Sequence, residues 1–531
     1  MVAAILGGSV SAGACSSTMI PYPSLDRANF ISLEANLIAN YSQAIPIGLY
    51  TNHGAVNVTN TSFCNVTLSY SHTGHNDTTY VQVWLPIDNW NGRIQAMGGA
   101  GYQAGANLLT IYGMTAAIGE GYSAVSTDAG LGDQVTPINW ALLPDGNVNL
   151  NLLEDLASIS LNDAAVIGKS ITSSFYGKPP KYSYWSGCSQ GGRQGLMLAQ
   201  RYPDAFDGIA ASSPAINWNQ FLMGDFWPSF LMDRMRVYPP SCEIDAITAA
   251  AIATCDGKDG ILDGVITDEV ACDFDSLSLV GTVINCTNFG TSIQISEDAA
   301  KLVQEVWSGA KRSDGSFLWF GLSKDAPLAG PSVTDLIVLP TTCSSNGTCK
   351  RGSFEISEDW IKLFVLKNSS ADLTTITHEQ FDSIALSAIK EYDSIIGTNN
   401  PDLSVFKAKG GKMISYHGLS DQAIPPRGSM HYYDAVAALD PSVHDFYRLF
   451  PAPGLLHCFG GSGAYPDGTF DALRKWVEEG VAPDALNATS VDTTPIINRK
   501  LCPYPKKQTL VGKAGTNYSA AAVDFNDFIC V

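Results

Sequence analysis

Apolar and polar positions along the first 215 residues follow two periodicities, one typical of strands and one typical of helices. Residues 152–171 and 191–201 have the composition and spacing of helices. The strands predicted around them are 80–86, 93–97, 122–128, 181–184 and 206–211. Because strands and helices follow one another in turn, the pattern predicts an α/β fold with a mainly parallel sheet covered on both faces.

The regular pattern does not extend over the whole chain. Residues 15–79 are rich in Ser, Thr, Asn and Val and are predicted to be mostly β-strand. Between residues 216 and 408 the periodicity is broken by Pro, Gly, Asn and scattered cysteines, and it resumes with a strand at 412–417. Such an insertion is too long for a loop. We therefore predict a main domain of residues 15–215 and 409–531, with residues 216–408 as a lid domain over it.

The motif at residues 187–191 (Gly-Cys-Ser-Gln-Gly) lies where a predicted strand turns into a predicted helix. This is the Gly-x-Ser-x-Gly pattern of a nucleophile elbow, in which glycines permit a strained turn that exposes the serine hydroxyl. The pattern alone is common by chance, but the flanking strand and helix favour Ser189 as a nucleophile. The amide of Gln190, at the helix start, is then placed to stabilise a negatively charged oxygen.

A glycine-rich turn, residues 98–101 (Gly-Gly-Ala-Gly), ends the predicted strand 93–97. Backbone amides can approach a ligand closely where side chains are small, so Gly99 and Ala100 are candidates for the second half of an oxyanion hole. An ordinary tight turn is the alternative interpretation.

A serine nucleophile needs an acid and a base, which follow it in that order in the α/β-hydrolase fold. Asp421 follows the strand predicted at 412–417, and His457 follows the next predicted strand, 446–450. His417 is the rival base, but it precedes the acid and would break the chain order.

Cysteines stand next to two of these residues. Cys188 precedes the serine and Cys458 follows the histidine, so a disulfide between them would tie nucleophile and base to each other.

Residues 255–265 form a second candidate site, within the insertion. Three aspartates, each followed by a glycine, suit a hard cation such as Ca²⁺, which we expect to have a structural role. The spacing is not that of an EF-hand, and a solvated acidic turn is the alternative. A disulfide between Cys255 and Cys272 would pre-order this loop. The predicted ligands are the carboxylates of Asp256, Asp259 and Asp263 and the main-chain carbonyl groups of Ile261 and Val265.

Composition narrows the class of protein. The net charge of −20 and the pI near 4.7 disfavour binding to nucleic acid or to an anionic membrane. No run approaches the roughly 18 apolar residues that a membrane-spanning helix requires. Twelve cysteines and the Asn-x-Ser/Thr sequons instead predict a secreted glycoprotein with N-glycans and disulfides. The sequons begin at Asn40, Asn57, Asn60, Asn65, Asn76, Asn285, Asn346, Asn368, Asn487 and Asn517.

Residues 1–14 are small and apolar and end in Ala-Gly-Ala, like a signal-peptide cleavage site. They lack the basic residues that usually begin a signal peptide, so we expect a signal-peptide remnant.

The motifs at 187–195 (Gly-Cys-Ser-Gln-Gly-Gly-Arg-Gln-Gly), 417–421 (His-Gly-Leu-Ser-Asp) and 457–458 (His-Cys) together resemble those of the tannase and feruloyl esterase family. The resemblance runs from about residue 15 to the C-terminus. It implies an α/β-hydrolase fold with a large inserted lid domain, a nucleophile, acid and base at Ser189, Asp421 and His457, calcium in the acidic loop and no organic cofactor. The implied disulfides are Cys188–Cys458, Cys15–Cys64, Cys255–Cys272 and Cys502–Cys530. The family often has a close cysteine pair after the calcium loop, whereas Cys286 has no near partner, so the pairing of Cys242, Cys286, Cys343 and Cys349 stays open.

The resemblance also implies the substrate class. It predicts a secreted esterase that cleaves feruloyl and related hydroxycinnamoyl esters of plant cell-wall material or small aromatic esters. Galloyl esters, the substrates of a tannase, are the close alternative. A catalytically silent binding protein with the same fold is a third possibility, which a lost triad residue would indicate, and none is lost here. Four aromatic residues of the insertion are predicted either to stack against the substrate or to fill the lid core: Trp218, Phe221, Phe226 and Trp227.

Overall fold

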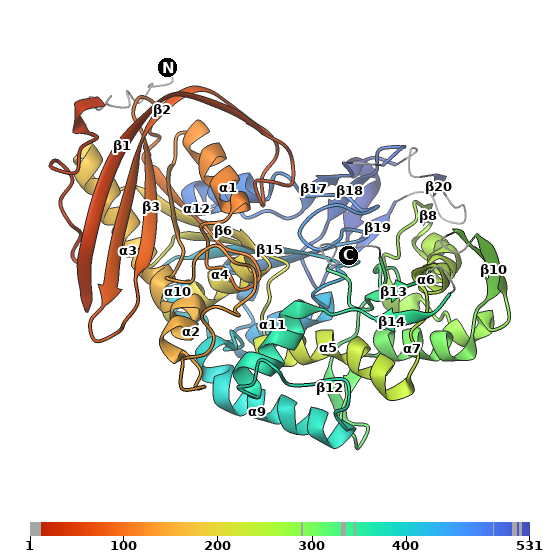
Figure 1. Ribbon diagram of the computed structural model, residues 1–531. Coiled ribbons are helices and arrows are strands. Elements are labelled where there is room, and N and C mark those ends of the chain that lie inside the picture. The colour runs from red at the N-terminus through yellow and green to blue at the C-terminus, as the bar shows by residue number, and fades with distance from the viewer. Residues whose placement is uncertain are drawn as a thin grey trace.

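A nine-stranded mixed sheet lies at the centre of the computed structural model (Figure 1). The structure describes residues 12–287, 290–330, 336–344, 347–491, 493–511, 518–519 and 523–531. Most of the expected signal-peptide remnant, residues 1–11, therefore lies outside the described residues, as do the sequons at Asn346 and Asn517.

The strand order of this sheet is β1-β2-β3-β5-β4-β6-β7-β15-β16. The strands from β5 to β16 in this order run parallel to their neighbours, whereas β1, β2, β3 and β5 pair antiparallel. This arrangement confirms the expected α/β-hydrolase fold. The strands are β1 (Ala28–Ile45), β2 (Val56–His72), β3 (Thr79–Pro86), β4 (Arg93–Met97), β5 (Ser123–Thr127), β6 (Tyr182–Cys188), β7 (Gly208–Ser212), β15 (Lys412–Gly418) and β16 (Tyr447–Ala452).

Helices cover both faces of the sheet, and a separate apolar core fills each side. Adjacent residues of one strand enter different cores, because successive side chains of a strand point to opposite faces: Tyr184 belongs to one cluster and Trp185 to the other. Helices α1 (Leu108–Gly119) and α12 (Thr469–Glu479) complete the core around Tyr184. The core around Trp185 is completed by α2 (Leu150–Ala157), α3 (Ile159–Tyr176), α4 (Gln190–Arg201) and α11 (Pro426–Leu439).

The helix expected at 152–171 is two helices. Ser158 separates α2 from α3 with φ −162° and ψ −37°, and its amide still bonds the carbonyl of Glu154. Nothing in the local sequence, such as a proline or glycine, indicates this break.

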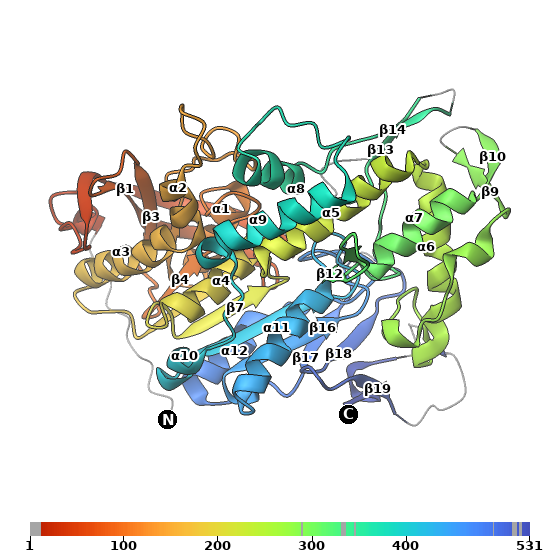
Figure 2. The same ribbon diagram turned by 90° about the horizontal axis from the view of Figure 1, so that it is seen from below.

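The insertion, residues 216–408, contributes no strand to the nine-stranded sheet among its described residues. Figure 2 shows its helices gathered beside the sheet, with α5 and α9 packed along each other. Trp218 and Phe226 of α5 belong to the same apolar cluster as Trp185 of β6, so the insertion and the sheet share one core. The insertion contains the helices α5 (Trp218–Met235), α6 (Ser241–Cys255), α7 (Glu297–Ser308), α8 (Glu355–Asp359), α9 (His378–Ile396) and α10 (Ser404–Ala408). The division into two domains at residues 216 and 408 stays a prediction.

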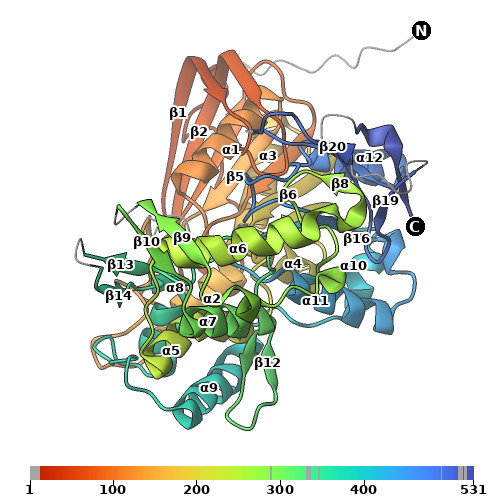
Figure 3. The same ribbon diagram turned by 90° about the vertical axis from the view of Figure 1, so that its right-hand side faces the viewer.

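Short strands, all in two-stranded sheets, complete the insertion and the C-terminal segment (Figure 3). In the insertion they are β8 (Ile261–Leu262), β9 (Val283–Cys286), β10 (Thr291–Gln294), β11 (Ala310–Lys311), β12 (Phe317–Trp319), β13 (Thr341–Cys343) and β14 (Cys349–Arg351). After α12 they are β17 (Leu486–Thr489), β18 (Asn498–Leu501), β19 (Gln508–Leu510), β20 (Tyr518–Ser519) and β21 (Phe528–Cys530). Strand β20 pairs with β8 and so joins the C-terminal segment to the acidic loop.

The twelve cysteines form six disulfides. All four expected pairs are present, and the cysteines whose pairing was open form Cys242–Cys286 and Cys343–Cys349. Among the described residues, none of the helices has the length and hydrophobicity needed to cross a bilayer.

Candidate active site

Ser189 lies at the sharp turn between β6 and α4. Its backbone has φ 63° and ψ −124°, a conformation that L-residues rarely adopt and that is typical of a nucleophile elbow. The turn is closed by contact between two glycines: a Cβ atom on Gly187 would lie 2.5 Å from the carbonyl carbon of Gly191. A larger residue at 187 would push the strand and the helix apart, and a Cβ atom on Gly191 would lie 3.0 Å from the carbonyl oxygen of Gly99, so both positions favour glycine.

The sheet brings the expected acid and base to the same edge as the serine. Strands β6, β7, β15 and β16 are consecutive and parallel, so their carboxyl ends meet there. Ser189 follows β6, Asp421 follows β15 and His457 follows β16. Cys188 and Cys458 are bonded, which holds the elbow against the histidine loop across 270 residues of sequence.

Asp421 is fully buried and holds His457 in a fixed orientation. The Nδ1 atom of His457 lies 2.8 Å from Oδ2 of Asp421, and Oδ1 accepts the amides of Ala423 and Ile424 at 2.9 and 2.8 Å. Burial alone would raise the pKa of the Asp421 carboxyl, but the neighbouring imidazoles of His457 and His417 lower it below its usual value. Asp421 is therefore ionised, and it can stabilise a positive charge on His457.

His417, the rival base, contacts the acid from the other side. Its Nε2 lies 3.1 Å from Oδ2 of Asp421 and 3.0 Å from the carbonyl oxygen of Ile424, and its Nδ1 lies 2.8 Å from Oγ of Ser429. Two acceptors at Nε2 require a proton on that nitrogen. His417 is 1% exposed and does not line the cavity at Ser189, so its place is behind the acid and not beside the nucleophile.

The oxyanion-hole candidates divide into two groups. The amide of Gly99 donates to Oε1 of Gln194 at 2.9 Å and is therefore engaged. The amides of Gln190 and Ala100 make no hydrogen bond within the described part of the chain. Ala100 lines one cavity that contains Ser189, and Gln190 lines a second one. The main-chain amides of Gln190 and Ala100 are therefore free to donate to an oxyanion, whereas the amide of Gly99 is not.

Ser189 and His457 line two adjoining cavities. The larger has a volume of about 300 Å³ and is bounded by the glycine-rich turn and by α1. The narrower one is lined mainly by apolar side chains, among them Trp218, Phe221 and Phe354. Of the four aromatic residues predicted either to stack against the substrate or to fill the lid core, Trp218 and Phe221 line the narrower cavity. Phe226 and Trp227 are buried in the core and line neither of these two cavities.

Comparison with known proteins decides the family. The sequence matches the family of tannase and feruloyl esterase over residues 64–531. The chain belongs to this family. Its members named below are carboxylic ester hydrolases, and this chain is one as well.

Similar proteins include both activities of the family. A probable feruloyl esterase from Arthroderma benhamiae is 42% identical over 457 residues, which cover 84% of this chain and 83% of the relative. The tannin acyl hydrolase from Aspergillus niger has a similar structure, with a TM-score of 0.86, 25% identity and coverage of 99% and 96% of the two chains. Feruloyl esterase B from Aspergillus oryzae has a TM-score of 0.76 at 28% identity, with coverage of 96% and 97%.

The acidic loop at residues 255–265 is held by contacts among its own residues and with Arg499. Asp256 accepts the amides of Asp263 and Val265 at 3.1 and 3.4 Å, so the loop folds back on itself. Arg499 of β18 pairs with Asp259 at 3.4 Å and also with Asp263. One oxygen of Asp263, Oδ1, is buried without a hydrogen bond in the described residues.

The charges of this loop also fit a divalent ion. Burial, opposed by Arg499 and reinforced by the neighbouring carboxylates of Asp256 and Asp259, raises the pKa of Asp263 to about 6. One guanidinium cannot balance three carboxylates, and an all-oxygen donor set is what Ca²⁺ prefers. The donor types therefore suit Ca²⁺, but the carboxylates of the three aspartates do not all lie within 4.8 Å of one another, so the loop would have to close around the ion.

The sequence did not indicate two residues that the structure places at the site. Gln194, which holds the amide of Gly99, lies within the glycine-rich motif, and its position one turn after Gln190 is the only local signal. Asp225 of α5 lines the narrow cavity but has no motif around it. It is 3% exposed, and its carboxyl group makes no hydrogen bond to another described residue.

Proposed function

We propose that this chain hydrolyses esters of hydroxylated aromatic acids, with feruloyl-type esters as the preferred substrates. The observation that carries the proposal is the convergence of Ser189 and the Asp421–His457 pair on a cavity with an aromatic wall. Relatives named feruloyl esterase are frequent among the similar sequences, which favours feruloyl over galloyl esters.

The proposed chemistry is acyl transfer in two steps. Asp421 binds Nδ1 of His457, which leaves Nε2 to take the proton of Ser189 as its oxygen attacks the ester carbonyl. The amides of Gln190 and Ala100 stabilise the oxyanion, and His457 then gives the proton to the leaving alcohol. Water attacks the acyl-enzyme by the same route and releases the aromatic acid.

The narrow cavity offers an apolar wall for the aromatic ring of the acid, but its volume of about 30 Å³ means that it must widen before a ring can enter. Trp218, Phe221 and Phe354 provide apolar surface for stacking, and the wider cavity on the other side of Ser189 leaves room for the alcohol part. Burial, reinforced by the negative charge of Asp421, raises the pKa of Asp225 well above its usual value. Asp225 is therefore a neutral acid inside an apolar cavity, placed to exchange hydrogen bonds with a ring hydroxyl.

Galloyl esters are the second candidate. The structural similarity to the tannin acyl hydrolase from Aspergillus niger supports this alternative, since that protein has the higher TM-score of the two relatives described. A gallate ring carries more hydroxyl groups than a ferulate ring but lacks the propenoyl arm of a cinnamate. The length of acyl group that the narrow cavity accepts should therefore decide which ester is cleaved faster.

We further propose that the enzyme is secreted and that it holds a structural Ca²⁺ in the loop at residues 256–265. Six disulfides favour an oxidising compartment. Seven sequon asparagines are exposed and available for glycosylation, whereas Asn65 is half-buried. The exposed sequon residues are Asn40, Asn57, Asn60, Asn76, Asn285, Asn368 and Asn487.

The test of this function is the rate of hydrolysis of methyl ferulate, methyl caffeate, methyl p-coumarate and methyl gallate, with Ser189→Ala as the blank. Faster cleavage of the cinnamates is expected. Faster cleavage of the gallate would make the enzyme a tannase. Equal rates for wild type and Ser189→Ala would reject the assigned nucleophile, and no cleavage of any of the four would favour another ester or a silent binding protein.

A further inference from the structure

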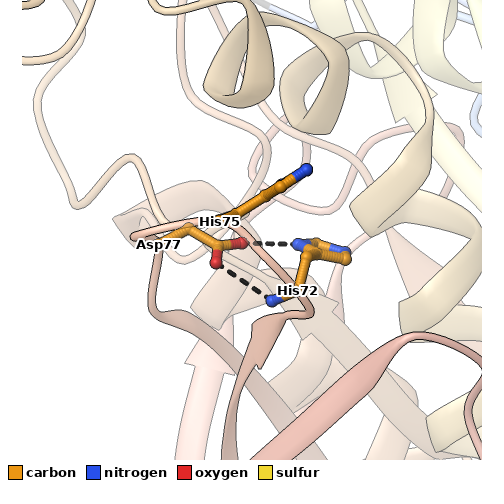
Figure 4. Close-up of side chains that lie close together, drawn as sticks. All are labelled: His72, His75 and Asp77. Atoms are coloured by element: carbon orange, nitrogen blue, oxygen red, sulfur yellow. Dashed lines mark hydrogen bonds and ion pairs between the residues drawn. The ribbon is translucent and has the colours of Figure 1, made fainter.

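A group of histidine and aspartate side chains lies at the far end of β2, where the turn to β3 passes over helices α2 and α3. His72 ends β2, and His75 and Asp77 belong to the turn. A ligand atom of each lies within 4.8 Å of those of the other two, and among the described residues this is the one such group of three (Figure 4). None of the three lines the cavities at Ser189.

Asp155 of α2 adds a fourth donor to this group. Its Oδ1 lies 3.7 Å from Nδ1 of His72, and the residue is only 1% exposed. Its other oxygen, Oδ2, is buried without a hydrogen bond of good geometry to any described residue, although the hydroxyl of Ser160 lies near this carboxyl. The Nδ1 atom of His75 is buried and unpartnered in the same sense. Buried polar atoms without partners are rare in folded proteins, and a bound ion is one of the few explanations for them.

The charges around His72 also indicate a bound cation. Asp77 lies 2.5 Å from Nδ1 of His72, and Asp163 of α3 lies 2.9 Å from its Nε2, so three carboxylates including Asp155 surround one imidazole. No lysine or arginine pairs with any of the three in the structure as described. Even a protonated His72 leaves an excess of buried negative charge, which is costly unless a cation compensates it.

We propose that this group binds a divalent transition-metal ion of the Zn²⁺ class. The ligands are Nδ1 of His72, a ring nitrogen of His75, and one oxygen each from Asp77 and Asp155. Mixed imidazole and carboxylate donors suit Zn²⁺ and not Ca²⁺, which prefers oxygen alone. In the metal-free protein, Nδ1 of His72 shares a proton with Asp77, and the ion takes the place of that proton.

The surroundings already hold two of these ligands in place. Asp163 binds Nε2 of His72, which is the carboxylate–histidine–metal arrangement common around zinc. The main-chain amide of His72 donates to Oδ1 of Asp77 at 3.0 Å and leaves Oδ2 toward the imidazole (Figure 4). With four protein ligands the site is closed, so the ion would fasten the β2–β3 turn to α2 and α3 and take no part in ester cleavage.

A protonated His72 held by three carboxylates is the competing explanation. It accounts for the contacts of His72, and Ser160 lies beside the carboxyl of Asp155, but this explanation gives no partner to Nδ1 of His75. The two explanations differ in what His75 contributes. In the metal site His75 is a ligand, whereas in the competing explanation it is a half-exposed side chain that takes no part in the ion-pair network.

The experiment is a titration of chelator-treated, calcium-loaded full-length enzyme with Zn²⁺ by calorimetry, and with Co²⁺ by visible absorbance. One ion per chain is expected, with the d–d bands of a tetrahedral nitrogen and oxygen site for Co²⁺. The His75→Ala variant, which removes a half-exposed ligand and should fold, is expected to bind Zn²⁺ about 100-fold more weakly. The Asp163→Asn variant should bind about 10-fold more weakly, because it loses only the orienting contact.

His431→Ala, a change at an exposed histidine of α11, is the matched control and should bind Zn²⁺ like the wild type. Absence of Zn²⁺ binding by the folded wild type would overturn the proposal, and so would binding that His75→Ala leaves unchanged. Esterase activity at a temperature well below melting should be the same with and without Zn²⁺. The test therefore stands whether or not the proposed substrate is correct.

Discussion

Asp421 is the residue on which the orientation of the base depends. Replacement by Asn keeps the shape, but its amide group favours the wrong tautomer of His457 and provides no negative charge. We expect Asp421→Asn to lower kcat by about 10⁴-fold with little change in KM. Steady-state kinetics on methyl ferulate measure this effect, and an unchanged melting temperature would show that the variant is folded. A loss of less than tenfold would mean that another group orients His457.

The same carboxyl group should make stability depend on pH. The pKa of Asp421 is lower in the folded protein than in the unfolded chain, despite burial, because His457 and His417 favour the ionised form. Its stabilising contribution is therefore complete above the unfolded value of about 4 and is lost as the pH falls below it. Urea unfolding at pH 7 and at pH 3.5 should show a smaller difference between wild type and Asp421→Asn at the lower pH. An equal difference at both would contradict the lowered pKa.

Asp225 is the residue that we expect to distinguish hydroxylated from plain aromatic acids. Asp225→Leu removes the neutral acid but keeps the volume and the apolar character of the narrow cavity. The ratio of kcat/KM for methyl p-coumarate to that for methyl cinnamate, which lacks the ring hydroxyl, should fall about 3- to 10-fold, the value of one hydrogen bond. Methyl cinnamate is the internal control. An equal loss on both esters would mean that the change disturbs the cavity in general.

At the scale of elements, the Cys188–Cys458 disulfide joins the elbow to the loop after β16. Replacing both cysteines by alanine should lower kcat, because the loop can then move His457 away from Ser189. It should also lower the free energy of unfolding by about 2–5 kcal/mol, since this bond closes a long loop. Kinetics and urea unfolding give the two quantities separately.

The Cys343–Cys349 bond is the matched control, because it closes a loop with a sequence separation of only 6 and lies outside the cavities at Ser189. Its double alanine variant should keep the wild-type kcat and lose less stability. If both double variants had the same kcat, the disulfide beside the elbow would have only a stabilising role.

An element can be predicted from the sequence when the residues that determine it lie close together in the chain. The turn at Ser189 follows from glycines next to the serine, so the elbow and the strand and helix that flank it are readable from the sequence. The break at Ser158 lies where Arg193 and Arg201 of α4 bind the end of α2, and the pairing of Cys242 with Cys286 likewise joins distant segments. Asp225 is one of several acidic residues in helices, and only the packing of α5 against the site gives it a role.

At the scale of the whole molecule, the chain order of acid and base could be predicted because the order of parallel strands fixes which loops meet. The hydrogen bond from the amide of Gly99 to Gln194 could not be predicted, because no sequence pattern shows in which direction the side chain of Gln194 leaves α4. The antiparallel strands β1 to β3 extend the sheet away from the site. The β2–β3 turn contains the proposed zinc group, so the two functional regions lie at the same edge of the sheet but over different strands.

The acidic loop connects two distant parts of the molecule, and its proposed Ca²⁺ should therefore affect stability and not catalysis. Asp259 and Asp263 pair with Arg499 of β18, and β8 pairs with β20, so the loop joins the insertion to the C-terminal segment. Removing Ca²⁺ with EGTA should lower the melting temperature by about 2–4 °C, which corresponds to about 2–3 kcal/mol for an ion present at 100 times its Kd. Because EGTA also binds Zn²⁺, the protein is freed of Zn²⁺ before the comparison, and added Ca²⁺ should then restore the melting temperature.

Two variants make this test specific to the loop. Asp263→Asn should melt at the lower temperature with or without EGTA, whereas Asp314→Asn, at an exposed turn of the insertion, should respond to EGTA like the wild type. At 25 °C, kcat should be the same in all of these proteins, because none of the loop residues lines the cavities at Ser189. A melting temperature that EGTA leaves unchanged would remove the calcium site. A loss of kcat without unfolding would instead mean that the loop positions the insertion over the substrate.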